Sequence, residues 1–298
     1  IVIPALIWFR LKWFKRPGAM SCDSSTSIFR GTCVDLPSFL VTAFIAALVS
    51  AFGSGLLSTF VVLRRASFTS EAFAHIAFAG MAFALLAGLP YGLVTFAFVA
   101  AVAFTVGLAS SKMAVAEVNL TTIFLAVSMA TGVLLLSLNK GYTPDIADYL
   151  FGNILLVGED DLFVLSILAV VDLVWLAVFF RAMYYTAYNE TAAAVYRIPV
   201  RLVTTGFLVL LACNIVVAVK IAGVVMITAG LVLPGTIALL ITRRILMAHA
   251  IAVLVSLGAT IGGFLLSYTG DLPTGPLVVL TQFGAFILVL AVRGLVRR

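Results

Sequence analysis

Long apolar segments, separated by short polar stretches, follow one another along almost the whole chain. Each comes close to the roughly 20 residues that an α-helix needs to cross about 30 Å of hydrocarbon. Nine such segments are found, over 36–63, 67–89, 91–110, 118–138, 162–180, 202–219, 221–242, 246–268 and 277–292. The pattern predicts an all-α fold, a polytopic membrane bundle of about nine transmembrane helices within residues 36–298.

The composition agrees with this pattern. Of the 298 residues, 63% are apolar and only 10% are charged, and the mean hydropathy is +1.23. A soluble domain carries far more charge. The chain is therefore expected to be an integral membrane protein surrounded by lipid.

The basic residues predict the orientation of the bundle. If the nine helices alternate in direction, eleven lysines and arginines fall on one side and two on the other. The eleven are Arg64, Arg65, Lys112, Arg181, Arg197, Arg201, Arg243, Arg244, Arg293, Arg297 and Arg298, and the two are Lys140 and Lys220. Because cytoplasmic loops carry such an excess, we expect the basic side, including the C-terminus, to be cytoplasmic. The formal net charge of +6 then reflects topology, and no nucleic-acid partner is expected.

The opposite side of the predicted bundle is acidic. Its carboxylates are Asp145, Asp148, Glu159, Asp160, Asp161 and Asp271. Two interpretations stay open: these groups raise the local concentration of cations at an outer mouth, or they are the ordinary charge of exposed loops.

Residues 1–35 form an N-terminal extension that does not fit the charge rule. Arg10, Lys12, Lys15 and Arg16 would lie on the outer side. One explanation is an interfacial anchor of basic and aromatic residues. We favour another, in which Met20 is the physiological start and the residues before it are not native.

The three cysteines give little information. Cys22 and Cys33 lie in the external extension, and whether they pair depends on an oxidising compartment. Cys213 stands alone in a predicted helix, as a small buried apolar residue would.

Glu71 and His75 stand one helical turn apart in TSEAFAHIAFAGMAFALLAG (69–88). An ionisable group in the bilayer core costs about 2.5–3.5 kcal/mol on insertion scales, so these two side chains should face protein, water or a passing ion rather than lipid. A structural polar contact between packed helices is the alternative. A carboxylate with an imidazole suits manganese, iron or zinc better than calcium or magnesium, which prefer oxygen ligands alone.

Asp172 lies near the middle of the fifth predicted helix and is a further candidate metal ligand. Contact with water, with Asn214 or with a second subunit is an equally open interpretation. In the later helices, Pro234 is expected to break the helix. Gly258 and Gly262 form a GxxxG face for close helix packing.

Enzyme motifs are missing from the sequence. It contains no GxxxxGK[ST], GxSxG or HExxH pattern, and it has only two histidines. A lipid-interface or packing role for His249, near the basic end of the eighth helix, is favoured over ligation. We therefore expect no catalysis by this chain and no stably bound cofactor.

Four segments in order resemble the permease subunits of metal-ion ABC importers, the family that takes up zinc, manganese and iron chelates. The segments are FVVLRRASFTSEAFAHIAFAGMAFALLAG (60–88), DYLFGNILLVGEDDL (148–162), GVVMITAGLVLPGTIAL (223–239) and SYTGDLPTGPLVVL (267–280). The first departs from the family pattern, since the aspartate is Glu71, the following serine is Ala74 and the preceding glycine is Ser70. The resemblance implies that Glu71 and His75 line the translocation path and coordinate the transported metal.

The connection over 181–201 resembles the family segment that docks into the ATP-hydrolysing subunit. Its matching residues are Tyr188, Asn189, Glu190, Ala193 and Pro199, with asparagine in place of the family's aspartate at 189 and Arg197 in place of its glycine. Asn189 is expected to cap a short helix over 189–194. An ordinary surface loop is the alternative.

The resemblance implies an ATP-driven importer of divalent metal ions in a bacterial cytoplasmic membrane. Its partners would be a cytoplasmic ATP-binding subunit, an extracytoplasmic metal-binding protein and a second permease copy, identical or paralogous. A secondary transporter or channel is the alternative function, although such carriers often contain repeated halves and no convincing repeat is found here. A purely structural membrane subunit is a third.

Overall fold

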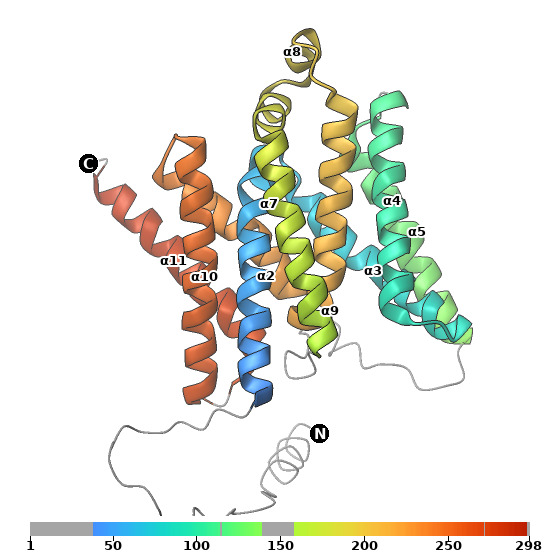
Figure 1. The fold of residues 1–298 in the computed structure, drawn as a ribbon, viewed down its shortest axis with the longest axis horizontal. Helices are drawn as coiled ribbons and strands as arrows, with labels where there is room; N and C mark the ends of the chain where they lie inside the picture. The colour runs from blue at the N-terminus through green and yellow to red at the C-terminus, as the bar shows by residue number, and fades with distance from the viewer. Residues whose placement is uncertain (1–37, 114, 139–157, 271, 297–298) are drawn as a thin grey trace, which may run out of the picture. The chain divides into compact units, whose positions relative to one another are not determined.

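The computed structural model describes residues 38–113, 115–138, 158–270 and 272–296. These residues are mainly α-helical and are joined by short turns (Figure 1). The helices are α2 (Ser38–Leu63), α3 (Ser67–Ala87), α4 (Tyr91–Met113), α5 (Glu117–Leu138), α7 (Glu159–Tyr188), α8 (Glu190–Val195), α9 (Val200–Ile241), α10 (Ile245–Gly270) and α11 (Thr274–Val296). Residues 1–37 and 139–157, with Met20, Cys22 and Cys33, lie outside the described part.

Nine segments of the described chain are long and apolar enough to cross a membrane. Their limits lie within a few residues of the predicted ones in most helices, as in Ser67–Ala87 and Glu117–Leu138. The fifth extends further, to Tyr188. The predicted all-α membrane bundle is confirmed.

The long helix α9 contains two of these segments, Val200–Val219 and Ala222–Ile241. The helix is kinked at Gly223, the second residue of the second segment, where the backbone angles are φ 74° and ψ 163°. Glycine adopts a positive φ without the steric cost that a Cβ brings. The two spans agree with the apolar pattern, whereas the kink at Gly223 is a feature that the sequence analysis did not predict.

The prediction that Pro234 breaks its helix is wrong. α9 stays helical through Pro234 to Ile241, and its only non-helical angles are those of Gly223. Proline removes one backbone bond and crowds the preceding turn, but neighbouring helices supply replacement contacts in a membrane bundle. Here the amide of Gly235 donates a hydrogen bond of 2.6 Å to the hydroxyl of Ser58 in α2.

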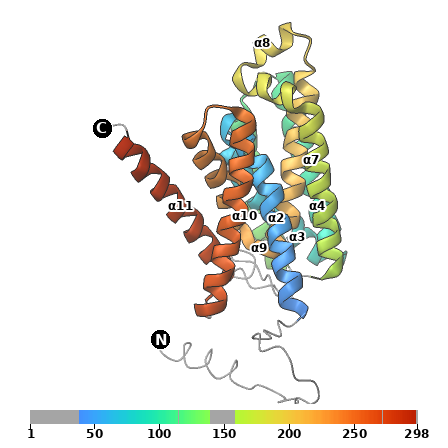
Figure 2. The same ribbon diagram turned by 60° about the vertical axis from the view of Figure 1, so that its left-hand side comes forward.

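The bundle is built around α2 and α9 (Figures 1 and 2). α2 packs against α7, α9 and α10, while α3 packs mainly against α4, α5 and α9 rather than against its chain neighbour α2. Large side chains fill the contacts, among them Phe60, Phe73, Phe207 and Leu211, all fully buried. α9 thus connects the helices packed around α2, which are α7 and α10, with the helices packed around α3, which are α4 and α5.

The GxxxG pair does not make the close contact that the sequence predicts for it. A Cβ built on Gly258 would meet no atom within 4 Å, and one on Gly262 would only touch Thr281 at 3.9 Å. The close approach is at the neighbouring Gly263, where a Cβ would lie 2.6 Å from the Cα of Val278 in α11. Consecutive residues of an α-helix are about 100° apart around its axis, so Gly262 and Gly263 face different directions and only Gly263 faces α11 closely.

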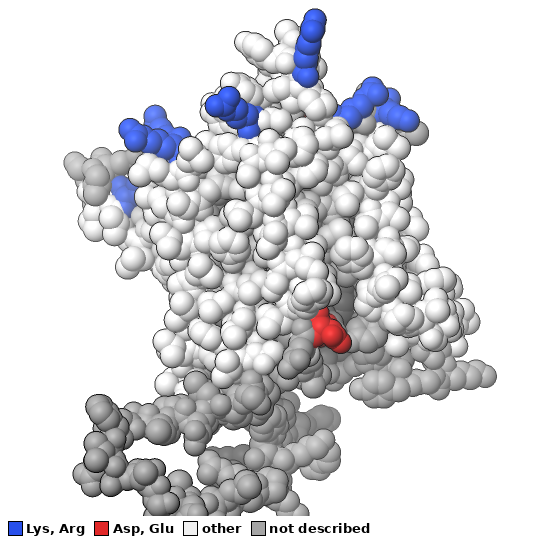
Figure 3. All heavy atoms as spheres, in the orientation of Figure 1, with Lys and Arg blue, Asp and Glu red and all other residues white. Residues whose placement is uncertain are grey.

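Lysine and arginine side chains gather at the end of the bundle where α8 lies (Figure 3). We call this the basic end. It contains the α2–α3 turn, the end of α4, the α7–α9 connection, the α9–α10 turn and the end of α11, where Arg64, Lys112, Arg197, Arg243 and Arg293 are placed. The alternation of the helices inferred from charge is therefore present in the fold.

Candidate functional site

The turn between α2 and α3 sets the direction of the predicted metal ligands. The backbone amide of Ala66 donates to the carbonyl of Val61 over 2.8 Å. Arg65 has a φ of 57°, which is uncommon for a residue with a side chain. α3 then begins at Ser67. This tight turn fixes the phase of the helix on which Glu71 and His75 stand.

Glu71 and His75 lie on the side of α3 that the described residues cover least. Glu71 is exposed and His75 is half-buried, whereas residues 72–74 between them are buried. Phe68, three residues before Glu71, is also exposed. Residues three and four apart share a helix face, so Phe68, Glu71 and His75 form one stripe, which we call the α3 face.

The α3 face is closer to the basic end than to the other end of the helix. At a rise of 1.5 Å per residue, Glu71 lies about 6 Å and His75 about 12 Å beyond the start of α3 at Ser67. An ion leaving these two ligands toward the basic end would have only one or two helical turns to pass.

Asp172 lies elsewhere, in α7, and is fully buried. Its Oδ1 accepts a hydrogen bond of 2.8 Å from Nδ2 of Asn214 in α9, which also donates to the carbonyl of Leu210 over 3.0 Å. Its Oδ2 has no hydrogen-bond partner among the described residues. Of the interpretations that the sequence left open, the contact with Asn214 is the one that the structure contains.

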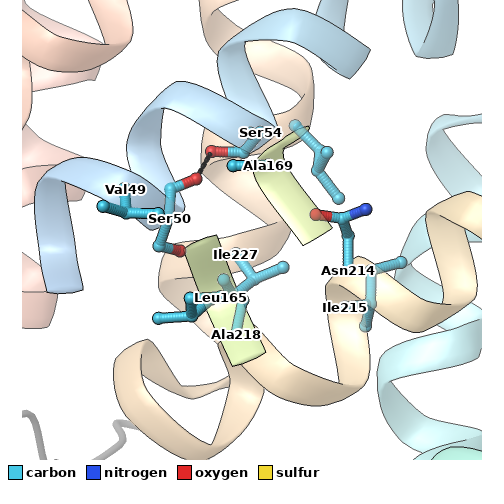
Figure 4. Close-up of a pocket in the computed structure, with 11 residues that line it drawn as sticks. Val49, Ser50, Ser54, Leu165, Ala169, Asn214, Ile215, Ala218 and Ile227 are labelled. Carbon is cyan, nitrogen blue, oxygen red and sulfur yellow. Dashed lines mark hydrogen bonds between the residues drawn. The ribbon is translucent and has the colours of Figure 1, made fainter. Parts of the chain in front are cut away.

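A small cavity lies beside this pair, between α2, α7 and α9 (Figure 4). The hydroxyl of Ser54 lies at the cavity and donates to the carbonyl of Ser50 over 2.8 Å. The remaining lining consists of Val49, Gly53, Leu165, Ala169, Asn214, Ile215, Ala218, Ile227 and Leu231. The lining contains no carboxylate, imidazole or thiolate, so it is poorly suited to a divalent transition metal.

The structure does not bring Asp172 together with Glu71 and His75. Among the described residues, no group of three or more histidines, cysteines, aspartates and glutamates is close enough to hold a metal ion. Glu71 and His75 therefore remain two candidate ligands on the α3 face. Coordination by so few groups would suit an ion in passage, which must be released as well as bound.

The predicted docking segment begins later than the sequence suggests. α7 continues as a helix to Tyr188, so the first eight residues of the 181–201 connection are not a loop. The short helix follows as α8, and the side-chain oxygen of Asn189 accepts a hydrogen bond of 3.1 Å from the amide of Ala192. The predicted cap is confirmed.

The residues matched to the docking segment differ in exposure. Tyr188 is 81% exposed, and Asn189, Glu190 and Pro199 are also exposed. Ala193, in contrast, is 1% exposed. Ala193 therefore faces the bundle, where its small side chain allows α8 to lie close, and the other four present their side chains outward.

Arg64 has contacts that the sequence analysis did not anticipate, since it entered there only as a topological charge. Its side chain is 6% exposed and forms an ion pair of 3.5 Å with Oε1 of Glu190. The same Nη2 donates to the hydroxyl of Thr204 over 3.0 Å. Arg64 and Glu190 are too far apart in the chain for a local sequence pattern to relate them. The only sequence signal at this position is the pair of arginines in the α2–α3 turn.

His249 and Cys213 both have packing roles, which for His249 is one of the two roles that the sequence left open. The imidazole of His249 is buried and contacts the rings of Phe60 and Phe180 at centroid distances of 4.7 and 5.3 Å. Its Nδ1 lies 2.9 Å from the carbonyl oxygen of Ile245. Cys213 is buried with a free thiol.

Comparison with known proteins extends over nearly the whole described part of the chain. Residues 37–293 match the model of the ABC 3 transport family. A probable metal transport system membrane protein of Thermotoga maritima is 35% identical, and the alignment covers 84% of this chain and 88% of that protein. The manganese transport system membrane protein MntC of Listeria monocytogenes is 26% identical over 82% of this chain and 86% of its own length.

A solved structure has the same fold. The structure of PsaBC from Streptococcus pneumoniae in complex with Fab matches with a TM-score of 0.73 and 25% sequence identity. The match covers 85% of this chain and 91% of that one.

Proposed function

Because this chain belongs to the ABC 3 transport family and is the membrane component of a metal ABC transport system, we propose that its substrate is a divalent manganese or iron ion that passes Glu71 and His75. The chain itself is not an enzyme. An ATP-hydrolysing subunit and a metal-binding protein are its partners in the transport system. Family membership also rules out the alternative of a carrier that is not coupled to ATP.

The uncovered α3 face is the observation that carries this proposal. A carboxylate that faced lipid within a membrane-spanning helix would cost several kcal/mol. Glu71 is nevertheless exposed in the isolated chain, while the residues behind it are buried. The cost is avoided if the α3 face borders a water-filled path that is closed by another subunit.

A second permease copy is the subunit that we place against the α3 face. A two-fold interface uses the same patch on both copies, so it would set two carboxylates and two imidazoles around one path. Four such ligands match the preference of manganese, iron and zinc for mixed oxygen and nitrogen coordination. The names of the related proteins favour manganese or iron among these three.

The basic end is the cytoplasmic side in this proposal, because positive residues are retained there during insertion. α8 and the exposed Tyr188, Asn189, Glu190 and Pro199 then point toward the ATP-hydrolysing subunit. The metal-binding protein delivers the ion at the opposite end. ATP-dependent movement of the docked subunits opens the path to one side and then to the other.

The test is metal uptake by the complete transporter in proteoliposomes. Glu71→Gln removes the charge but keeps the size of the side chain, and His75→Ala removes the imidazole. Each should lower ATP-dependent uptake of ⁵⁴Mn or ⁵⁵Fe at least about tenfold, which corresponds to the loss of roughly 1.4 kcal/mol of ion stabilisation.

Glu71→Asp is the matched control, since it keeps a carboxylate at the same position on a side chain that is one methylene shorter. It should retain most of the uptake. Wild-type uptake by both Glu71→Gln and His75→Ala would contradict the placement of the ion on the α3 face.

A further inference from the structure

Arg64 occupies an unusual position for an arginine in a turn. It follows the last residue of α2, yet its side chain is only 6% exposed. The guanidinium carbon lies 5.3 Å from the centre of the Phe207 ring, a cation–π distance. Burial lowers the pKa of Arg64, and the nearby carboxylates of Glu117 and Glu190 oppose this effect.

The two carboxylates that attract Arg64 belong to different parts of the fold. Glu190 is the first residue of α8, the helix at the docking surface. Glu117 is the first residue of α5, and its Oε1 accepts a hydrogen bond of 3.2 Å from the hydroxyl of Thr69. Thr69 lies in the first turn of α3, two residues before Glu71. Arg64 thus stands between the docking helix and the start of the helix that bears the metal ligands.

The ion pair between Arg64 and Glu190 is easily broken. The Glu190 side chain is 60% exposed and the N–O distance is 3.5 Å. Pairs with an exposed partner contribute little to stability. When it breaks, Arg64 keeps its bond to Thr204 and the field of Glu117. Breaking a buried ion pair is costly when it leaves an uncompensated charge in the interior. Arg64 keeps these other interactions, so its charge stays compensated.

We propose that Arg64 is a positioning residue that transmits the movement of α8 to the α2–α3 turn, and through it to Glu71 and His75. In one state Arg64 is shared between Glu190 and Glu117. In the other, α8 is displaced, Arg64 interacts with Glu117 alone, and the start of α3 shifts with the Thr69–Glu117 contact. The inference rests on the proposed function, since it requires a docked ATP-hydrolysing subunit.

The experiment measures ATP hydrolysed per metal ion transported by the complete transporter in proteoliposomes. Glu190→Gln removes the charge that attracts Arg64 and, because the side chain is exposed, should leave folding unchanged. We expect the ratio of ATP to transported ion to rise about two- to fivefold, the range that follows from a pair with one exposed partner. The ATP-hydrolysing subunit should still co-purify with the variant.

A double-mutant cycle then assigns the effect to Arg64. Arg64→Gln alone should raise the ratio of ATP to transported ion at least as much as Glu190→Gln does. The double variant should have a ratio no higher than that of Arg64→Gln. Arg243→Gln removes an exposed charge from another turn of the basic end and is the matched control. It should leave the ratio unchanged.

Three outcomes would overturn this inference. The first is a normal ratio of ATP to transported ion in Glu190→Gln. The second is loss of the ATP-hydrolysing subunit from that variant, which would make Glu190 a docking contact only. The third is additive effects of the two substitutions in the double variant. Failure of the proposed function is recognised separately, because wild-type proteoliposomes would then transport no metal.

Discussion

At the scale of single residues, Asp172 shows how a membrane helix accommodates a carboxylate. It is fully buried and accepts a hydrogen bond from Asn214. Gly53 of α2 makes room for the pair, since a Cβ there would lie 3.2 Å from Oδ2 of Asp172 and 3.3 Å from Oδ1 of Asn214. The three residues bring α2, α7 and α9 together away from the α3 face. We therefore propose that Asp172 is an interhelical contact rather than a metal ligand.

Substitution of Asp172 separates these two roles. Asp172→Asn keeps the oxygen that accepts from Asn214, so thermal stability in detergent and metal uptake should both stay close to wild type. Asp172→Leu removes the acceptor of one of the two hydrogen bonds that the Asn214 amide donates, and should lower the free energy of unfolding by about 1–3 kcal/mol. Loss of uptake by a fully stable Asp172→Asn variant would instead place Asp172 on the ion path.

At the scale of helices, the position of a glycine relative to the neighbouring helix decides whether it allows close packing, and the GxxxG motif alone does not. Gly258, Gly262 and Gly263 all lie in α10, but only Gly263 is in close contact with α11, where Val278 approaches it. The GxxxG spacing identifies a face with small residues. Which neighbour reaches that face, and at which residue, depends on the rotation and crossing angle of the two helices.

Two alanine substitutions in α10 test this difference. Gly263→Ala places a methyl group 2.6 Å from the backbone of Val278 and should destabilise the protein by about 1–3 kcal/mol, as overpacking typically does. Gly258→Ala meets no atom within 4 Å and should be neutral or stabilising by up to about 1 kcal/mol through helix propensity. Thermal unfolding in detergent measures both. Equal effects of the two substitutions would contradict the packing of α10 on α11.

At the scale of the whole molecule, the α3 face indicates that one chain does not complete the transport path. Glu71 and His75 lie on its uncovered side, and no third ligand accompanies them among the described residues. In the proposed assembly, a path between two copies would supply the missing ligands and keep the carboxylates from lipid. The functional unit is therefore proposed to be larger than the chain.

Cross-linking of single-cysteine variants tests this assembly. In a background with Cys22, Cys33 and Cys213 replaced by serine, Phe68→Cys places a thiol on the α3 face, where Phe68 is 39% exposed. A short bifunctional thiol reagent applied to membranes should give a covalent dimer of this variant. Leu288→Cys, on α11 and 66% exposed, is the control and should stay monomeric. A dimer from Leu288→Cys alone would move the interface away from α3.

The sequence by itself determined the class of the protein, the nine spans and their alternation, and it supplied the segment that we propose as the metal site. These features follow from local properties: the length of an apolar run, the position of charge relative to it, and the spacing of two side chains on one helix. The cap at Asn189 was predicted for the same reason, because its hydrogen bond reaches only Ala192.

Only the tertiary structure decided which residues meet across the fold. It placed Asp172 with Asn214, Gly263 with Val278, and the helix break at Gly223 instead of Pro234. It also brought Arg64 to Glu190, which lies 126 residues further along the chain. Such contacts depend on the rotation and crossing of whole helices, and the apolar surfaces that set these angles are too uniform along a membrane helix for its sequence to specify them.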